Sequence, residues 1–173
     1  MLTITEFCDR HDACEEGRAW ALENCKDMQQ VWDTIKPEWL VWTATRDGVL
    51  TDKEQRLFAV FCARQVEHLL TDQRSRDAID VADRFARGLA TDSELAAARD
   101  AAWAAAWASA MGARDAAWAA ASAAALAAAC ASIDDAARAT RAAAGDAASA
   151  AARDAQAEWL RANTQPNFEE VSI

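Results

Sequence analysis

Three residues near the start of the chain have the types and the spacing of metal ligands. Cys8, His11 and Cys14 follow one another at intervals of three, and Cys25 lies farther along. Zinc prefers thiolate and imidazole ligands, and on a helix these intervals keep the first three within about 120° of one face. Structural zinc sites, however, usually lie on hairpins or knuckles, and Asp12 indicates a helix boundary between the proposed ligands. We therefore favour the ordinary alternative, which is a set of small buried thiols.

No pair of residues has the spacing of a nucleophile and its base. Cys62 and His68 lie six residues apart, which on a helix places them about 120° apart and out of hydrogen-bonding reach. Adjacent carboxylates such as Asp134 and Asp135 suit a solvated helix start better than acid catalysis. The chain also lacks the common phosphate-binding, dinucleotide, zinc-protease and hydrolase motifs. The sequence therefore predicts no enzyme activity, no cofactor and no catalytic residue.

Three tryptophans, Trp32, Trp39 and Trp42, could serve either a helical core or an interface. Tryptophan is enriched in binding hot spots, but a chain without tyrosine needs such large side chains to fill its core. Large apolar groups are usually buried, so we favour the core for most of them.

The composition restricts the partners and the location of the protein. A net charge of -10 repels nucleic acids and anionic membranes, whereas it attracts a basic protein surface. Five scattered cysteines without a leading signal peptide indicate reduced thiols in the cytoplasm. Residues 116–133 carry no charge, but alanine and serine dominate there and aspartates flank the segment, so we expect no membrane span.

The first 90 residues contain the start and stop signals of several short helices. Asp47 and Gly48 indicate a turn between helices, and Gly88 ends a stripe of apolar residues that begins at Ala78. The predicted helix starts are Thr3 with Glu6, Asp12 before the segment of Trp20, Asp27 with Gln30, Pro37 in a first turn, Thr51 with Glu54, and Thr91 with Glu94.

Alanine dominates the second half of the chain. From Leu95 to Asn163 only Gly112 and Gly145 interrupt good helix formers, and one continuous helix would reach about 100 Å. A protein of this size is expected to fold such a segment back on itself. We place the break near Gly112 or, preferably, near residues 132–135, where serine and aspartate favour a new helix start.

These patterns predict an all-α protein, a helical bundle with several short N-terminal helices and a long Ala-rich C-terminal helical hairpin. A single helical domain is expected over residues 1–163, with a short-helix part at 1–90 and Ala-rich helices at 91–163. Residues 164–173 form a C-terminal tail, which either docks on the body through Phe168, Val171 and Ile173 or stays free.

The order of several segments is characteristic. The run from His11 to Trp20 precedes Trp32, and the segments Pro37–Trp42, Phe61–Arg64 and Ala78–Thr91 follow before the Ala/Trp-rich helix. In this order the chain resembles the Imm-5-like family of immunity proteins from about Cys8 to Arg161. The resemblance implies a small helical protein of bacteria and mobile elements that neutralises a toxin or another effector by binding it. It implies no particular site residue.

Three functions agree with these observations. The leading hypothesis is a non-enzymatic protein-binding inhibitor of the immunity type that occludes the surface of a partner with a basic surface. The alternative is a phage or mobile-element anti-defence protein, such as an anti-CRISPR, which binds a host defence complex. A further alternative is a structural or assembly protein that forms a homo-oligomer through its alanine-rich face.

Acidic residues on exposed helix faces are the candidate contacts of the inhibitor, because charge speeds the capture of an oppositely charged partner. These candidates are Asp100, Asp115, Asp134, Asp135 and Glu158.

Overall fold

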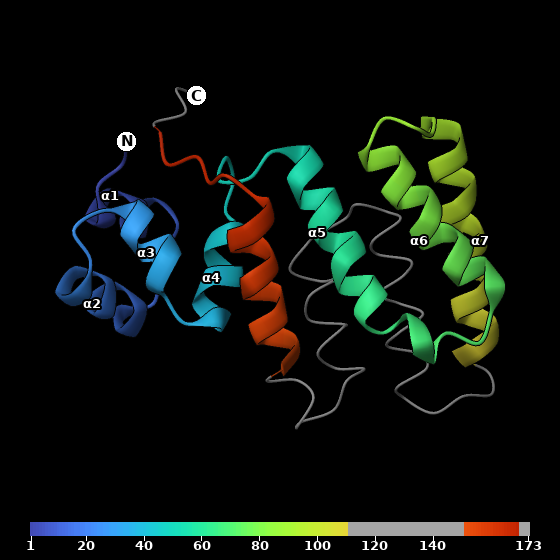
Figure 1. The fold of residues 1–173 in the computed structure, drawn as a ribbon, viewed down its shortest axis with the longest axis horizontal. Helices are drawn as coiled ribbons and strands as arrows, with labels where there is room; N and C mark the ends of the chain where they lie inside the picture. The colour runs from blue at the N-terminus through green and yellow to red at the C-terminus, as the bar shows by residue number, and fades with distance from the viewer. Residues whose placement is uncertain (111–150, 170–173) are drawn as a thin grey trace. The chain divides into compact units, whose positions relative to one another are not determined.

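The computed structural model describes residues 1–110 and 151–169, and all regular structure in these ranges is helical (Figure 1). The predicted all-α fold class is therefore confirmed. The helices are α1 (Ile4–Arg10), α2 (Glu15–Asn24), α3 (Met28–Thr34), α4 (Pro37–Ala44), α5 (Asp52–Gln65), α6 (Gln73–Ala86) and α7 (Asp92–Ala110), with a 3-10 turn at Glu67–Leu69 and a last helix at residues 151–163. Both proposed breaks of the Ala-rich hairpin lie outside the described residues.

The chain divides into two compact units. The first unit contains Met1–Thr51 and Ala157–Ile173, and the second unit contains Asp52–Gln156. The predicted single domain over residues 1–163 stays a prediction. Within the described residues, no helix has the length and the apolar character that a membrane crossing requires. The uncharged segment at 116–133 is not among them.

Side-chain caps begin α1 and α3, and a proline begins α4, as predicted. The Thr3 hydroxyl accepts the Glu6 N–H at 3.2 Å, and the Glu6 carboxylate accepts the Thr3 N–H at 2.8 Å, which completes a capping box. The Asp27 carboxylate accepts the Gln30 N–H at 2.8 Å at the start of α3. Pro37 is the first residue of α4. An N–H at this position has no partner within the helix, so proline loses no hydrogen bond there.

The junction of α1 and α2 corrects one prediction, because Asp12 does not begin a helix. Asp12 has a φ of 50°, and the N–H of Ala13 donates to the Cys8 carbonyl at 3.0 Å. This is the bond of a Schellman motif, in which a residue in the left-handed region ends a helix. The short polar side chain of aspartate tolerates that conformation, so Asp12 ends α1 and Cys14 becomes the N-cap of α2.

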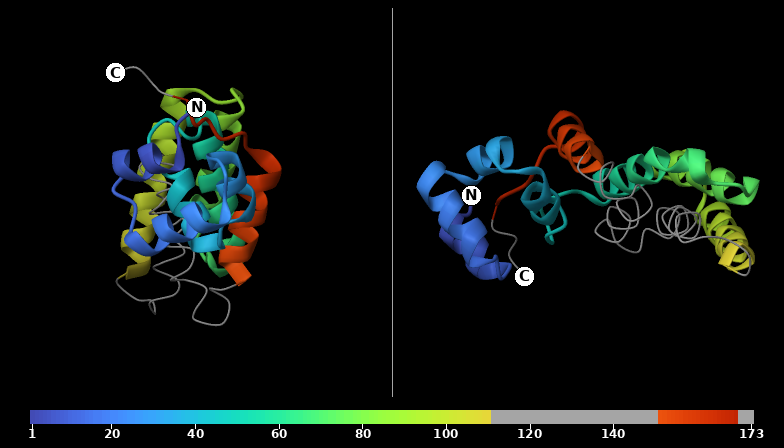
Figure 2. Two further views of the ribbon diagram at one scale, coloured as in Figure 1. Left: turned by 90° about the vertical axis from the view of Figure 1, so that its left-hand side faces the viewer. Right: turned by 90° about the horizontal axis from the view of Figure 1, so that it is seen from below.

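The second unit contains α5, α6 and α7, and α6 and α7 lie side by side as an antiparallel pair (Figures 1 and 2). Alanine lines the buried side of both helices, at Ala78 and Ala82 in α6 and at Ala102 and Ala105 in α7. Such small side chains allow close packing of the helix backbones. Arg84 of α6 also pairs with a Glu94 carboxylate oxygen of α7 at 3.1 Å.

The C-terminal segment completes the first unit, and it runs beside the start of the chain in Figures 1 and 2. The Leu2 N–H donates to the Phe168 carbonyl at 2.6 Å, and the Asn167 N–H donates to the Val49 carbonyl at 2.8 Å. Phe168 is 3% exposed and packs its ring edge-on against Phe7. Of the two possibilities for the tail, docking is correct for Phe168, whereas Val171 and Ile173 lie outside the described residues.

Gly88 provides a test of how α6 ends. It has a φ of 74°, and its N–H donates to the Phe85 carbonyl at 2.9 Å in a second Schellman motif. No atom lies within 4 Å of the position of an added Cβ, so Gly88→Ala meets no clash. We expect this substitution to lower the free energy of unfolding by about 1 kcal/mol, because an L side chain is disfavoured in the left-handed region. Urea denaturation followed by circular dichroism measures the change.

The control is the same substitution at Gly17, which lies within α2 and has no positive φ. There alanine improves helix propensity by up to about 1 kcal/mol. Its Cβ would lie 3.3 Å from the sulfur of Cys14, an exposed side chain that can shift by the few tenths of an ångström required. Gly17→Ala is therefore expected to be neutral or stabilising. Equal effects at both glycines would contradict the assigned end of α6.

Candidate functional site

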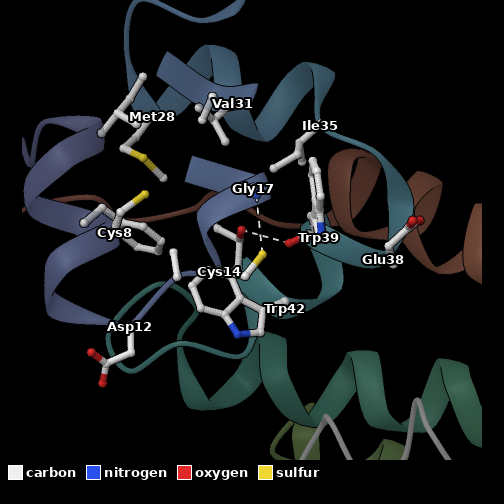
Figure 3. Close-up of a pocket in the computed structure, with 15 residues that line it drawn as sticks. Cys8, Asp12, Cys14, Gly17, Met28, Val31, Ile35, Glu38, Trp39 and Trp42 are labelled. Atoms are coloured by element: carbon white, nitrogen blue, oxygen red, sulfur yellow. Dashed lines mark hydrogen bonds between the residues drawn. The ribbon is translucent and has the colours of Figure 1, made fainter. Parts of the chain in front are cut away.

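The first unit contains an apolar pocket of about 350 Å³ between α1, α2, α3 and α4 (Figure 3). Fifteen residues line this pocket, and most of them are apolar. Its aromatic walls are Phe7, Trp39 and Trp42. Ligand pockets typically measure roughly 300–1,000 Å³, so this volume suits a small molecule or one or two bulky side chains.

Trp39 and Trp42 of α4 form one wall of the pocket. They are three residues apart on the helix and therefore neighbours on its surface, and both are half-buried. The Lys36 ammonium lies 3.6 Å from the centre of the Trp39 ring, and the Arg46 guanidinium lies 4.7 Å from that of Trp42. Cation–π contacts of this kind contribute roughly 0.5–1 kcal/mol at exposed positions. They hold both indoles in place beside the open pocket.

The first turn of α2 forms a second wall of the pocket, and at Gly17 this wall has no side chain. Cys14 is the N-cap, and its sulfur accepts the Gly17 N–H at 3.4 Å. A Cβ added at Gly17 would lie 3.3 Å from the Cys14 sulfur and 3.8 Å from the Trp39 ring. Glycine at this position therefore leaves space between α2 and Trp39 that a larger side chain would occupy.

Three sulfur atoms also line the pocket. Cys8 and Met28 are buried, whereas Cys14 is exposed. Burial raises the pKa of the Cys8 thiol above its ordinary value of 9.0, so this thiol stays protonated and is a poor nucleophile at neutral pH. Polarisable sulfur packs favourably against aromatic rings, and these side chains adapt to the shape of a guest.

The polar groups of the pocket are few and do not form a catalytic set. Asp12 and Glu38 contribute exposed carboxylates. The Thr43 hydroxyl donates to the Trp39 carbonyl at 2.9 Å and is thus already engaged. In the described part of the chain, no group of histidine, cysteine, aspartate or glutamate side chains could hold a metal ion. The arrangement is suited to binding an apolar group.

The four residues considered as zinc ligands lie in different environments. Cys8 is buried in α1, and His11 is the C-cap of that helix, with its ring 4.6 Å from that of Phe7. Cys14 is the N-cap of α2, and Cys25 ends the same helix, with its sulfur 3.5 Å from the Thr34 hydroxyl. Two of these residues, Cys8 and Cys14, line the pocket.

Two of the candidate acidic contacts, Asp100 and Glu158, lie among the described residues, and they belong to different units. Asp100 lies on α7 with a side chain that is 72% exposed, and its carboxylate is 3.2 Å from Arg99. Glu158 is exposed on the helix at residues 151–163 and belongs to the first unit, whereas Asp100 belongs to the second. Asp115, Asp134 and Asp135 lie outside the described residues.

The pocket itself was not predicted from the sequence. The core interpretation of the tryptophans is correct for Trp32, which is 2% exposed, but Trp39 and Trp42 are half-buried and open to the pocket. Gly17 could have indicated the site, because a glycine inside a helix needs a packing reason. The apolar spacing of α1 and α3 does not distinguish a pocket wall from an ordinary core.

Comparisons with protein-family models, with curated proteins and with solved structures found no match to this chain. The resemblance to the Imm-5-like family of immunity proteins therefore stays a prediction.

His11 lies beside this site and is half-buried against Phe7. Burial lowers the pKa of His11 below its ordinary value of 6.5, and the positive charges of Arg46 and Arg10 lower it further, while Asp47 opposes them. The unfolded chain therefore binds a proton at His11 more readily than the folded chain. The contribution of His11 to stability is present above the unfolded pKa and is lost as the pH falls through the folded pKa.

A pH series tests this effect. We expect the free energy of unfolding to fall between pH 7 and pH 5.5, and His11→Asn should remove much of this fall. Urea denaturation at both pH values measures it. The matched control is His68→Asn, which replaces the other histidine at an exposed position and should keep the fall. If both variants behave alike, His11 is not the group responsible.

Proposed function

We propose that this chain is a non-enzymatic, cytoplasmic protein of the immunity type, which binds a basic protein and inhibits it by covering a functional surface. The observation that carries the proposal is the apolar pocket lined by Trp39 and Trp42 within the more acidic of the two units. Tryptophan pairs in open apolar recesses are typical binding hot spots.

The distribution of charge supports a basic partner. Residues 1–51 and 157–173, which form the first unit, contain thirteen acidic and six basic side chains, giving a formal charge of -7 of the total of -10. Such a field accelerates the approach of a positively charged protein and repels nucleic acid. The second unit, at -3, contributes less to this attraction.

Inhibition by occlusion needs no chemistry from the inhibitor. The pocket provides apolar surface, and the carboxylates around it provide orientation, which together meet the requirements of a protein interface with a polar rim. A toxin and a host defence complex would both meet this description if they present basic surfaces. The anti-defence alternative thus differs from the immunity function in the identity of the partner and not in the mode of binding.

Association kinetics with the natural partner test the proposal. The tagged full chain captures that partner from its native host, and mass spectrometry identifies it. Stopped-flow mixing then measures the association rate at low and high salt. We expect Glu158→Lys to slow association by about two- to ten-fold at low salt, because it reverses a charge in the more acidic unit. The difference should disappear at high salt.

Two comparisons make the result specific. Glu158→Gln removes the charge without reversing it, so its rate should lie between those of the native chain and the lysine variant. Asp100→Lys makes the same charge reversal in the less acidic unit. Its association rate measures whether both units contribute to the electrostatic attraction of the partner. A captured complex whose association rate does not depend on salt would contradict electrostatic capture, and recovery of only a defined oligomer of this chain would favour self-assembly.

A further inference from the structure

We propose that the apolar pocket of the first unit receives one bulky apolar side chain, borne on a basic segment of the partner protein. This inference rests on the proposed protein-binding function and assigns that function to one recess. It also specifies the chemistry of the partner: leucine, methionine, phenylalanine or tryptophan with lysine or arginine beside it.

The recess has the features of a space that a partner fills. Protein interiors normally pack apolar side chains without voids of this size, but here Trp39 and Trp42 keep part of their surface in water. Covering apolar surface of this kind is favourable by roughly 25 cal/mol per Å². The cations Lys36 and Arg46 fix the two indoles from outside, so the pocket is formed before a guest arrives.

The walls select an apolar guest. Ile4, Phe7, Val31 and Ile35 present hydrocarbon, and sulfur atoms complete the lining. The Thr43 hydroxyl donates its proton to the Trp39 carbonyl, so it has no proton left to donate to a polar guest. A charged group placed inside would lose its hydration without compensation. An aromatic or thioether side chain would instead gain contacts with the rings and sulfur atoms.

The rim selects basic neighbours for that guest. The carboxylates of Asp12 and Glu38 line the pocket, and Glu16 lies 3.7 Å from the Lys36 ammonium. Lys36 also bridges to Glu38 at 3.3 Å while covering the Trp39 ring, and Arg46 covers Trp42. These two cations are thus engaged by rings or carboxylates, and Arg18, whose charge acts on the Cys8 thiol, pairs with Asp9. The remaining negative charge, together with that of the whole unit, favours lysine or arginine next to the inserted side chain.

Charge also decides between this occupant and the others that would fit. A second copy of the chain carries the same charge of -10 and would be repelled from the acidic unit. A small neutral molecule would gain nothing from the carboxylates at the rim. A basic protein segment is the occupant that uses both the walls and the rim.

A peptide selection tests the proposal without the natural partner. The immobilised full chain selects binders from a random dodecapeptide library displayed on phage, and the enriched peptides are synthesised. We expect them to share one bulky apolar residue flanked by lysine or arginine. Isothermal titration calorimetry then measures their affinity for the native chain.

Alkylation of Cys14 links binding to the pocket. This thiol is exposed at the pocket wall, so N-benzylmaleimide added to the folded protein places a bulky group there. Peptide affinity should fall by about ten-fold or more, as for the loss of a central contact. The matched control is Cys14→Ser, which keeps an N-cap acceptor for Gly17 but has no thiol. The same treatment should leave the affinity of this variant unchanged.

Each of the following results would overturn the proposal. Enriched peptides could be acidic or lack a bulky apolar residue, or their affinity could be unaffected by alkylation of the native chain. The neutral probe N-phenyl-1-naphthylamine could occupy the pocket while basic peptides do not, which would indicate a small-molecule site. Light scattering could reveal a dimer that alkylation of Cys14 dissociates, which would make a second copy the occupant.

The peptide experiment and the partner experiment can contradict the pocket inference and the proposed function separately. A chain that inhibits its captured partner but selects no pocket-dependent peptides keeps the proposed function and loses this inference. Pocket-dependent basic peptides without any inhibited partner would contradict the proposed function and leave the chemistry of the pocket as described.

Discussion

The first unit depends on closure by a segment from the other end of the chain. Its α3 helix has only seven residues, which is too short to be stable alone in water. Arg161 contacts the end of this helix, where its guanidinium donates to the carbonyls of Trp32 and Ile35. These carbonyls have no partner within the helix, and a positive charge is favourable at a helix C-terminus.

The same closure supports the pocket. Phe168 packs against the ring of Phe7, which is itself a wall of the pocket, and against the ring of Trp32, which lies on α3. Asn167 and Leu2 add backbone hydrogen bonds that connect the two ends of the chain. With α1 and α3 held by these contacts, the half-buried tryptophans of α4 can remain beside an open recess without collapse of the unit. Shape and charge at this recess are the basis of the proposed binding function.

Local chemistry explains what could be predicted from the sequence. Capping boxes, the proline in the first turn of α4 and the glycine that ends α6 involve residues within a few positions of one another, so their effects are readable from the chain. The prediction for Asp12 is wrong because aspartate serves both as an N-cap and as a left-handed helix end. The positive φ of Asp12 and the hydrogen bond from the Ala13 N–H to the Cys8 carbonyl distinguish the two roles.

The pocket and the closure could not be predicted, because both arise from contacts between distant parts of the chain. Arg161 and Trp32 are separated by 129 positions, and no periodicity or spacing connects them. Gly17 and Trp39 likewise meet only in the folded unit. The acidic candidates rest on expected exposure alone, and the two that are described, Asp100 and Glu158, are exposed but belong to different units.

Titration of the captured partner's activity with the purified chain tests the central claim most directly. A binding inhibitor that acts by occlusion removes activity in proportion to the amount added, reaches full inhibition at a fixed molar ratio, and gives the same result at early and late times. Separation of the complex at high salt should restore the activity. Progressive loss of activity with catalytic amounts of the chain, or inactivation that persists after separation, would contradict the account and indicate an enzyme.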